Sequence, residues 1–102
     1  MSNTRWHVMR REQTLVIEGE ITLATISPVL AAIMSLIQDE PPKDVDLSHL
    51  RLCDSSAVAL VLELQRHGGG HVLHAPPAFS AVVRACQLDA LFPYLAQNHS
   101  DS

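Results

Sequence analysis

Apolar and polar residues alternate in short runs at the start of the chain and then recur at helical spacing. Two runs that favour β-structure, Trp6–Arg10 and Thr14–Glu20, lie on either side of the polar residues Arg11–Gln13. Two strand-forming runs joined by a short polar turn predict a β-hairpin.

A helix is expected after the hairpin. Its apolar positions are spaced so that they share one helical face: Ile26, Val29, Leu30, Ile33 and Ile37. Ser27 before Pro28 suits an N-cap followed by a first-turn proline. The alternative is an earlier start, at Thr22, with a bend at the proline. The two prolines within Asp39–Lys43 end the helix, because proline cannot continue it.

The second half of the chain alternates strands and helices. The expected elements are, in order, a strand at Asp44–Leu50, a helix at Ser55–His67 ended by Gly68–Gly70, a strand at His71–Ala75 and a helix at Pro76–Leu88. Strands joined through a helix should be parallel, with a right-handed crossover. The sequence therefore predicts an α/β fold of order β-β-α-β-α-β-α, a single domain over residues 1–102 with helices packed on a small mixed sheet. Residues 89–95 should add one turn or edge piece, and residues 96–102 should fray.

Composition narrows the classes of function. Hydrophobic residues make up 47% of the 102 residues, more than a small core needs, which favours an interface. The net charge is −4 and the basic residues are scattered, which argues against a nucleic-acid-binding protein. Cys53 and Cys86 lie in apolar runs and predict free thiols in a reducing cytosol.

Neither a signal peptide nor a membrane helix is expected. The N-terminal residues include several charges and no long apolar run. The uncharged stretch Ile21–Gln38 contains hydroxyl residues and a proline, and its apolar residues are periodic. A soluble amphipathic helix is therefore the favoured interpretation of this stretch.

Three polar residues, Asp54, Ser55 and Ser56, stand where the second helix should begin. The first N–H groups of a helix lack partners, and an N-cap at Asp54 or Ser55 would contribute about 1 kcal/mol. One cap accounts for one polar residue but not for three in a row. A binding or regulatory role therefore stays open beside the structural one.

The same helix is apolar over a wider arc than a single core requires. Roughly 200° of its surface is apolar, where a helix on one core needs about 100°. The apolar positions are Ala57, Val58, Leu60, Val61, Leu62 and Leu64, and the expected solvent side is marked by Ala59, Glu63, Arg66 and His67. One flank is expected to face the core and the other a partner, and the pattern leaves open which leucine points outward.

Catalytic, metal and phosphate sites have little support. Adjacent Asp54 and Ser55 cannot form a triad, which needs a histidine between nucleophile and acid. His71 and His74 should point to opposite faces of a strand, so they cannot share one ion. Gly68–Gly70 lacks the spacing and the lysine of a phosphate-binding loop. We therefore expect no enzyme, no catalytic residue, no metal and no cofactor.

The chain resembles the STAS domain family over most of its length. The residues that carry the resemblance are the opening Thr14–Ile21, Pro28 in the first helix, the strand Asp44–Leu50, and Asp54–Leu62 at the start of the second helix. Within the family the chain looks most like the MlaB branch, the small STAS subunits of phospholipid-transport ABC complexes.

The resemblance implies binding rather than chemistry. It implies a cytoplasmic subunit, peripheral at the inner membrane, that regulates or stabilises an ABC transporter ATPase of the MlaF kind and so maintains outer-membrane lipid asymmetry. In such members the position of Ser55 lies at the surface that meets the ATPase. The residues expected at the partner surface are Asp54, Ser55, Ser56, Ala57, Val58, Leu60, Leu62 and Leu64.

The alternative within the family is an anti-sigma-factor antagonist that binds an anti-sigma kinase. Those proteins typically carry Asp-Ser-Ser-Gly and are switched by phosphorylation of the second serine. Ser56, or else Ser55, is then the expected phosphorylation site, although Ala57 stands where glycine is usual.

Overall fold

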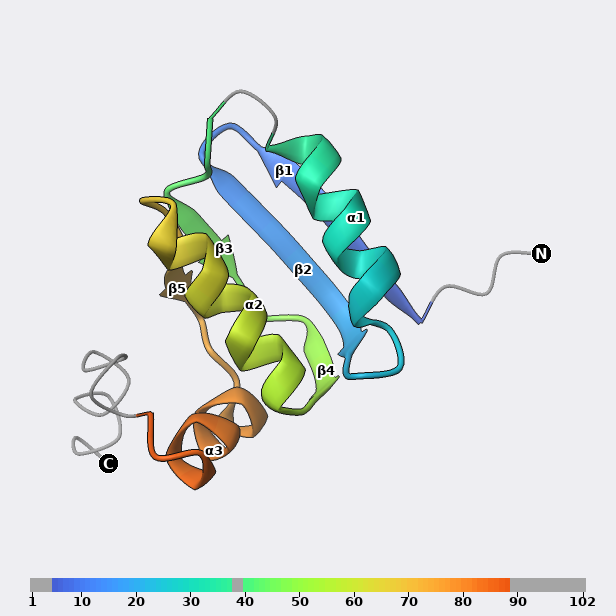
Figure 1. Cartoon of the computed structure of the whole chain (residues 1–102), viewed down its shortest axis with the longest axis vertical. Coiled ribbons are helices and arrows are strands. Elements are labelled where there is room, and N and C mark those ends of the chain that lie inside the picture. Colours follow the sequence, from blue (N-terminus) through green and yellow to red (C-terminus); the bar gives the residue numbers. More distant parts are fainter. Residues whose placement is uncertain (1–4, 38–39, 89–102) are drawn as a thin grey trace.

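The computed structural model describes residues 5–37 and 40–88. Its elements are β1 (Trp6–Arg11), β2 (Thr14–Ile21), α1 (Ile26–Leu36), β3 (Asp44–Asp46), β4 (Leu50–Cys53), α2 (Ser55–Arg66), β5 (His71–Leu73) and α3 (Pro77–Ala85), as drawn in Figure 1. The α/β fold with a small mixed sheet is confirmed. The expectations for residues 89–102 lie outside the described residues.

The central strand of the sheet is β2. On one side it pairs antiparallel with β1, which confirms the hairpin. On its other side it pairs in parallel with β3 over Thr14–Val16 and with β4 over Gly19–Ile21. β3 also pairs in parallel with β5, as the crossover through a helix predicts.

A turn divides the segment that the sequence predicts as one strand, Asp44–Leu50. The Asp46 carboxylate accepts a hydrogen bond from the backbone N–H of Ser48 (2.9 Å), and the N–H of Leu50 donates to the carbonyl of Leu47 (3.1 Å). The chain then enters β4, which the sequence analysis missed. Leu47 and Leu50 are both buried although a turn separates them, so the apolar pattern continues through the break.

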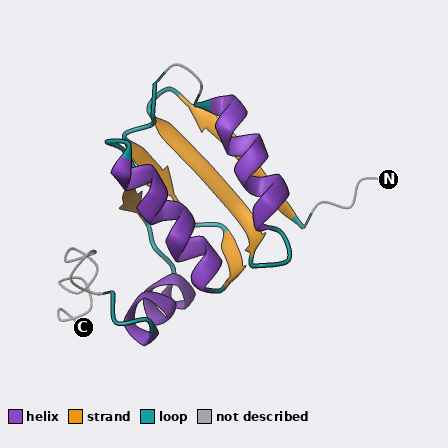
Figure 2. Cartoon of the chain, in the orientation of Figure 1, coloured by secondary structure: helices purple, strands orange, loops and turns teal. Residues whose placement is uncertain are grey.

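The core lies between one face of the sheet and the helices. Alternate residues of β2 are buried against α1 and α2, which cross the same face of the sheet in Figure 2. α3 packs against α2 and β4 at one end. The fully buried side chains include Leu15, Ile17 and Ile21 of β2, Val29 and Ile33 of α1, Val58 and Val61 of α2, and Phe79 of α3.

The helix ends follow from local hydrogen bonds. α1 begins at Ile26 with Thr25 as N-cap, so the predicted cap at Ser27 is wrong. The reason is a turn in which the Thr22 carbonyl accepts from the N–H groups of both Thr25 and Ile26, which carries the chain into the helix before Ser27. α2 ends as predicted at the glycines: Gly68 has φ 91°, and Gly69 donates its N–H to the carbonyl of Leu64 (3.2 Å).

Among residues 5–37 and 40–88, no helix has the length and apolarity to cross a bilayer.

One arginine fastens the end of α1 to the hairpin. The Arg10 guanidinium donates to the carbonyls of Glu12 (2.7 Å), Leu36 (3.1 Å) and Glu40 (2.7 Å), and its side chain is only 16% exposed. A guanidinium offers five N–H donors in a fixed fork, which suits three carbonyls from separate segments.

Loss of this fastening should lower stability. Arg10→Met keeps much of the apolar stem but leaves the three carbonyls without their charged donor. We expect the free energy of unfolding to fall by about 1–3 kcal/mol. Urea denaturation measures it, and Arg11→Met at the neighbouring exposed position is the matched control. Equal stability of the two variants would contradict the structural role of Arg10.

Candidate functional site

Asp54 links the start of α2 to the loop between β2 and α1. Its Oδ1 accepts from the backbone N–H of Ser56 (2.8 Å), which makes Asp54 the N-cap of α2. Its Oδ2 accepts from the backbone N–H of Leu23 (3.0 Å), 31 residues away in sequence. From the sequence, either Asp54 or Ser55 could be the N-cap of α2. In the structure the N-cap is Asp54.

The ionised form of Asp54 is favoured in the folded chain. Burial acts to raise the pKa of the carboxyl, but the hydrogen bonds from the backbone of Leu23 and Ser56 outweigh it, so the pKa lies below its usual range. A carboxyl whose pKa is lowered on folding stabilises the native state above its unfolded pKa. That contribution disappears as the pH falls through the folded pKa.

The stability difference between wild type and Asp54→Asn should therefore depend on pH. At neutral pH the wild type should be the more stable, because asparagine cannot carry the charge that both N–H groups favour. The difference should hold down to about pH 5 and shrink below about pH 4, where the carboxyl is protonated in the unfolded chain and then in the folded one. Urea denaturation of both proteins at several pH values tests this. A difference that grows on acidification would contradict the assignment.

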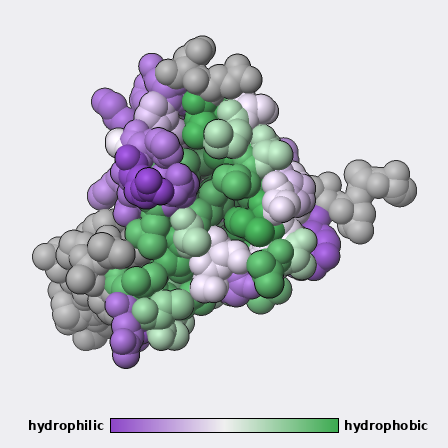
Figure 3. Space-filling model, viewed as in Figure 1, coloured by the Kyte–Doolittle hydropathy of each residue, from purple (hydrophilic) through white to green (hydrophobic). Residues whose placement is uncertain are grey.

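A groove between α1 and α2 opens beside this cap. It has a volume of about 210 Å³ and is lined by Ile26, Leu30, Ser56, Ala59, Leu60 and Glu63. Figure 3, which looks onto the helices, shows hydrophobic side chains gathered between α1 and α2. Leu30 is 40% exposed although its residue type favours burial. Ser56 lines this groove, whereas Ser55 is exposed.

The apolar arc of α2 is mostly core. Ala57, Val58, Leu60, Val61 and Leu64 are buried, and Leu62 is half-buried against the core. Leu60 and Leu64 are only 5% and 3% exposed, so neither projects outward in the isolated chain. The arc is wide because α2 contributes buried residues to the core over the sheet and also packs against α1 and α3.

The α1 side of the groove was not predicted from the sequence. Leu30 was expected on the core face of its helix and Ala59 on the solvent side of the next, whereas the structure brings both to one groove. Leu23, which is 77% exposed, was given no role. The available signal was the uncharged stretch Ile21–Gln38, which contains more apolar residues than one helix face accounts for.

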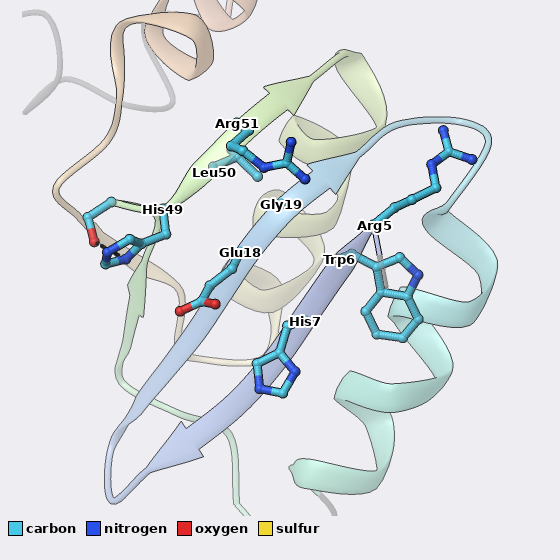
Figure 4. A pocket seen from close by; sticks show the side chains of 9 residues that line it. Arg5, Trp6, His7, Glu18, Gly19, His49, Leu50 and Arg51 are labelled. Atoms are coloured by element: carbon cyan, nitrogen blue, oxygen red, sulfur yellow. Dashed lines mark hydrogen bonds between the residues drawn. The ribbon is translucent and has the colours of Figure 1, made fainter. Parts of the chain in front are cut away.

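A second hollow lies on the opposite face of the sheet, away from the α2 N-terminus (Figure 4). Its volume is about 660 Å³, and it is lined by Arg5, Trp6, His7, Glu18, Gly19, Ser48, His49, Leu50 and Arg51. The Glu20 carboxylate forms ion pairs with two arginines at its rim, at 3.0 Å from Arg5 and 4.0 Å from Arg51. Within the described ranges no group of three metal-ligating side chains is brought together. Among its lining residues, the Ser48 hydroxyl lies 3.1 Å from Nδ1 of His49, and both side chains are exposed on the turn between β3 and β4.

Comparison with known families decides the family of this chain. A family model described as MlaB, STAS domain, matches residues 7–95.

The chain is a STAS domain of the MlaB family.

A solved structure of similar fold is that of the anti-sigma factor antagonist SpoIIAA in its unphosphorylated form, with a TM-score of 0.59 and 24% identity over 81% of each chain. At this identity the likeness concerns the fold. The search of curated proteins found no match. STAS domains of these two kinds are in general regulatory binding domains rather than enzymes. In this STAS domain, the Asp54 cap and the groove between α1 and α2 form the candidate site.

Proposed function

We propose that this STAS domain is a non-enzymatic subunit that binds, and regulates or stabilises, the cytoplasmic ATPase of an ABC-type phospholipid transporter maintaining outer-membrane lipid asymmetry. The observation that carries the proposal is the apolar groove between α1 and α2, beside the α2 N-terminus, in a chain of the MlaB family. The domain acts in the cytoplasm and reaches the inner membrane through the ATPase.

The chemistry of the groove supports a long-lived complex. α1 contains no charged residue, and the groove has one acidic residue, Glu63, at its rim. Glu63 is itself paired with Arg66 (3.0 Å) and His67 (3.3 Å). Surfaces of permanent complexes are more apolar than those of transient ones. The proposed partner surface is the rim and floor of this groove together with Asp54, Ser55 and Ser56.

A second candidate is an anti-sigma-factor antagonist switched by phosphorylation of Ser56 or Ser55. The observation in its favour is the run Asp54, Ser55, Ser56 at a helix N-terminus, on a fold shared with the antagonist SpoIIAA. Ala57 is 4% exposed and packs in the core, where the antagonists usually have glycine. The family match therefore favours the ATPase, and phosphorylation remains a proposal for either partner.

Affinity purification from native lysate distinguishes the two candidates. The tagged domain should retain an ABC ATPase, and the retained protein is identified by mass spectrometry. An Ala59→Arg variant, which fills the groove with a charged side chain, should lose that protein while a matched His71→Arg variant keeps it. Retention of a histidine-kinase-like anti-sigma factor in place of an ATPase would overturn the first candidate and support the second.

A further inference from the structure

Leu23 is the most exposed large hydrophobic residue in the described part of the chain, at 77%. It lies in the loop between β2 and α1, in the uncharged stretch that precedes the groove-lining residues Ile26 and Leu30. An exposed leucine on a mobile loop needs no explanation. This loop, however, is held by hydrogen bonds at every position.

The backbone N–H groups of four consecutive residues in this loop are all satisfied. Thr22 donates to the Thr25 hydroxyl (3.0 Å), Leu23 to Asp54 Oδ2 (3.0 Å), Ala24 to the Thr22 hydroxyl (3.2 Å) and Thr25 to the Thr22 carbonyl (2.9 Å). The Thr25 hydroxyl in turn donates to the carbonyl of Glu20 (2.8 Å). Of these four N–H groups, that of Leu23 is the one whose partner lies outside residues 22–25, so Asp54 fixes the backbone of Leu23 to the N-terminus of α2.

We infer that Leu23 is an anchor residue for the partner and that Asp54 is its positioning residue. An apolar side chain held in one place before binding loses little freedom on association, which is the basis of preorganised recognition. The segment from Ile21 to Gln38 contains no charged residue, so Leu23 presents the partner with an apolar contact that precedes the groove-lining Ile26 and Leu30 in the chain. This inference rests on the proposed function, and the occupant it commits to is the surface of the ATPase.

The two hydrogen bonds of Asp54 can be separated by one substitution. Asparagine is as good an N-cap as aspartate, so in Asp54→Asn the side-chain carbonyl still accepts from Ser56. The amide nitrogen that replaces Oδ2 is a donor and cannot accept from the N–H of Leu23. Asp54→Asn thus keeps the helix cap and removes the link to the loop.

The test is a double-mutant cycle on affinity for the purified ATPase, with Leu23→Ala and Asp54→Asn alone and together. Leu23→Ala should weaken binding by about tenfold or more, as expected of an anchor. Asp54→Asn should weaken it by about threefold or more, and the double variant should bind no more weakly than Leu23→Ala, because Asp54 acts through Leu23. Leu52→Ala, at an exposed leucine of β4, should bind as wild type.

Amide hydrogen exchange in the free domain measures directly how firmly the hydrogen bond to Asp54 holds the loop. In Asp54→Asn the Leu23 amide should exchange faster while the Ser56 amide keeps its protection. If the wild-type domain binds the ATPase and Leu23→Ala binds it with the same affinity, the anchor role of Leu23 is overturned and the proposed function stands. Additive effects in the double variant would likewise overturn the inference and leave the proposed function intact. Failure of the wild-type domain to bind the ATPase would overturn both.

Discussion

Ser56→Glu is expected to fold like the wild-type domain and to lose about a hundredfold or more in affinity for the proposed partner, the ATPase. Two effects compete at this position. The helix N-terminus favours added negative charge by roughly 0.3–1 kcal/mol. Burial of that charge in an apolar groove beside the ionised Asp54 costs about 3 kcal/mol or more when the partner covers it. The cost of burial is the larger effect, and 1.4 kcal/mol corresponds to a tenfold change in affinity.

Calorimetric titration with the purified ATPase, beside a melting curve, measures this effect. Ser55→Glu should lose less, because Ser55 is exposed whereas Ser56 lines the groove. Ser56→Ala should change affinity little, since it adds no charge. Ser48→Glu, in the turn on the far side of the sheet, is the matched control and should bind normally. Unchanged affinity in both Ser55→Glu and Ser56→Glu would exclude the two serines from the interface and leave them with a structural role in the first turn of α2.

Leu30→Glu is expected to abolish measurable binding while the domain keeps its fold. Leu30 is 40% exposed in the groove, so a charge there remains solvated in the free domain and becomes buried only in the complex. Truncation of a buried interface anchor costs about 2 kcal/mol or more, and an unpaired charge adds to that cost. Glutamate is a good helix former, which limits the effect on α1 itself.

The buried leucines of α2 should behave in the opposite way. Leu64→Glu places a charge at a position that is 3% exposed, and Leu60→Glu at one that is 5% exposed, so both should unfold the free domain. Leu52→Glu, at a leucine that is 52% exposed on β4, should affect neither folding nor binding. Titration and thermal melting of the four proteins check the ranking. Normal binding by folded Leu30→Glu would exclude the groove from the interface.

Hydrophobic periodicity predicts the helices and strands that bury one face and expose the other. The hairpin, the three helices and the parallel crossover follow from it, and the glycine stop of α2 follows from backbone conformation. The turn at Ser48 and His49 is not predicted by this reasoning, because the leucines on either side of it, Leu47 and Leu50, are both buried and the apolar pattern continues through it. The start of α1 escapes it because backbone hydrogen bonds to Thr22, rather than the residue types Ser27 and Pro28, decide where the helix begins.

The candidate site likewise has a part that local sequence predicts and a part that depends on tertiary packing. Asp54, Ser55 and Ser56 are recognisable from sequence because capping is local, and residue types at a helix start are restricted. The outward surface depends on how two helices pack, which no single helical pattern contains. Leu60 and Leu64 therefore counted as candidates for the partner surface although the neighbouring elements bury them. Leu23 and Leu30 reach the site only through tertiary contacts, including the hydrogen bond from the Leu23 backbone to Asp54.

The most direct test of the proposed complex is amide hydrogen exchange of the domain alone and in the presence of the purified ATPase. We predict added protection in residues 22–37 and 54–63, which carry Leu23, the groove and the α2 N-terminus. The strands β1 and β5 should exchange as they do in the free domain. Protection confined to β1 and the hollow on the opposite face of the sheet, or no protection at all, would contradict the proposed complex.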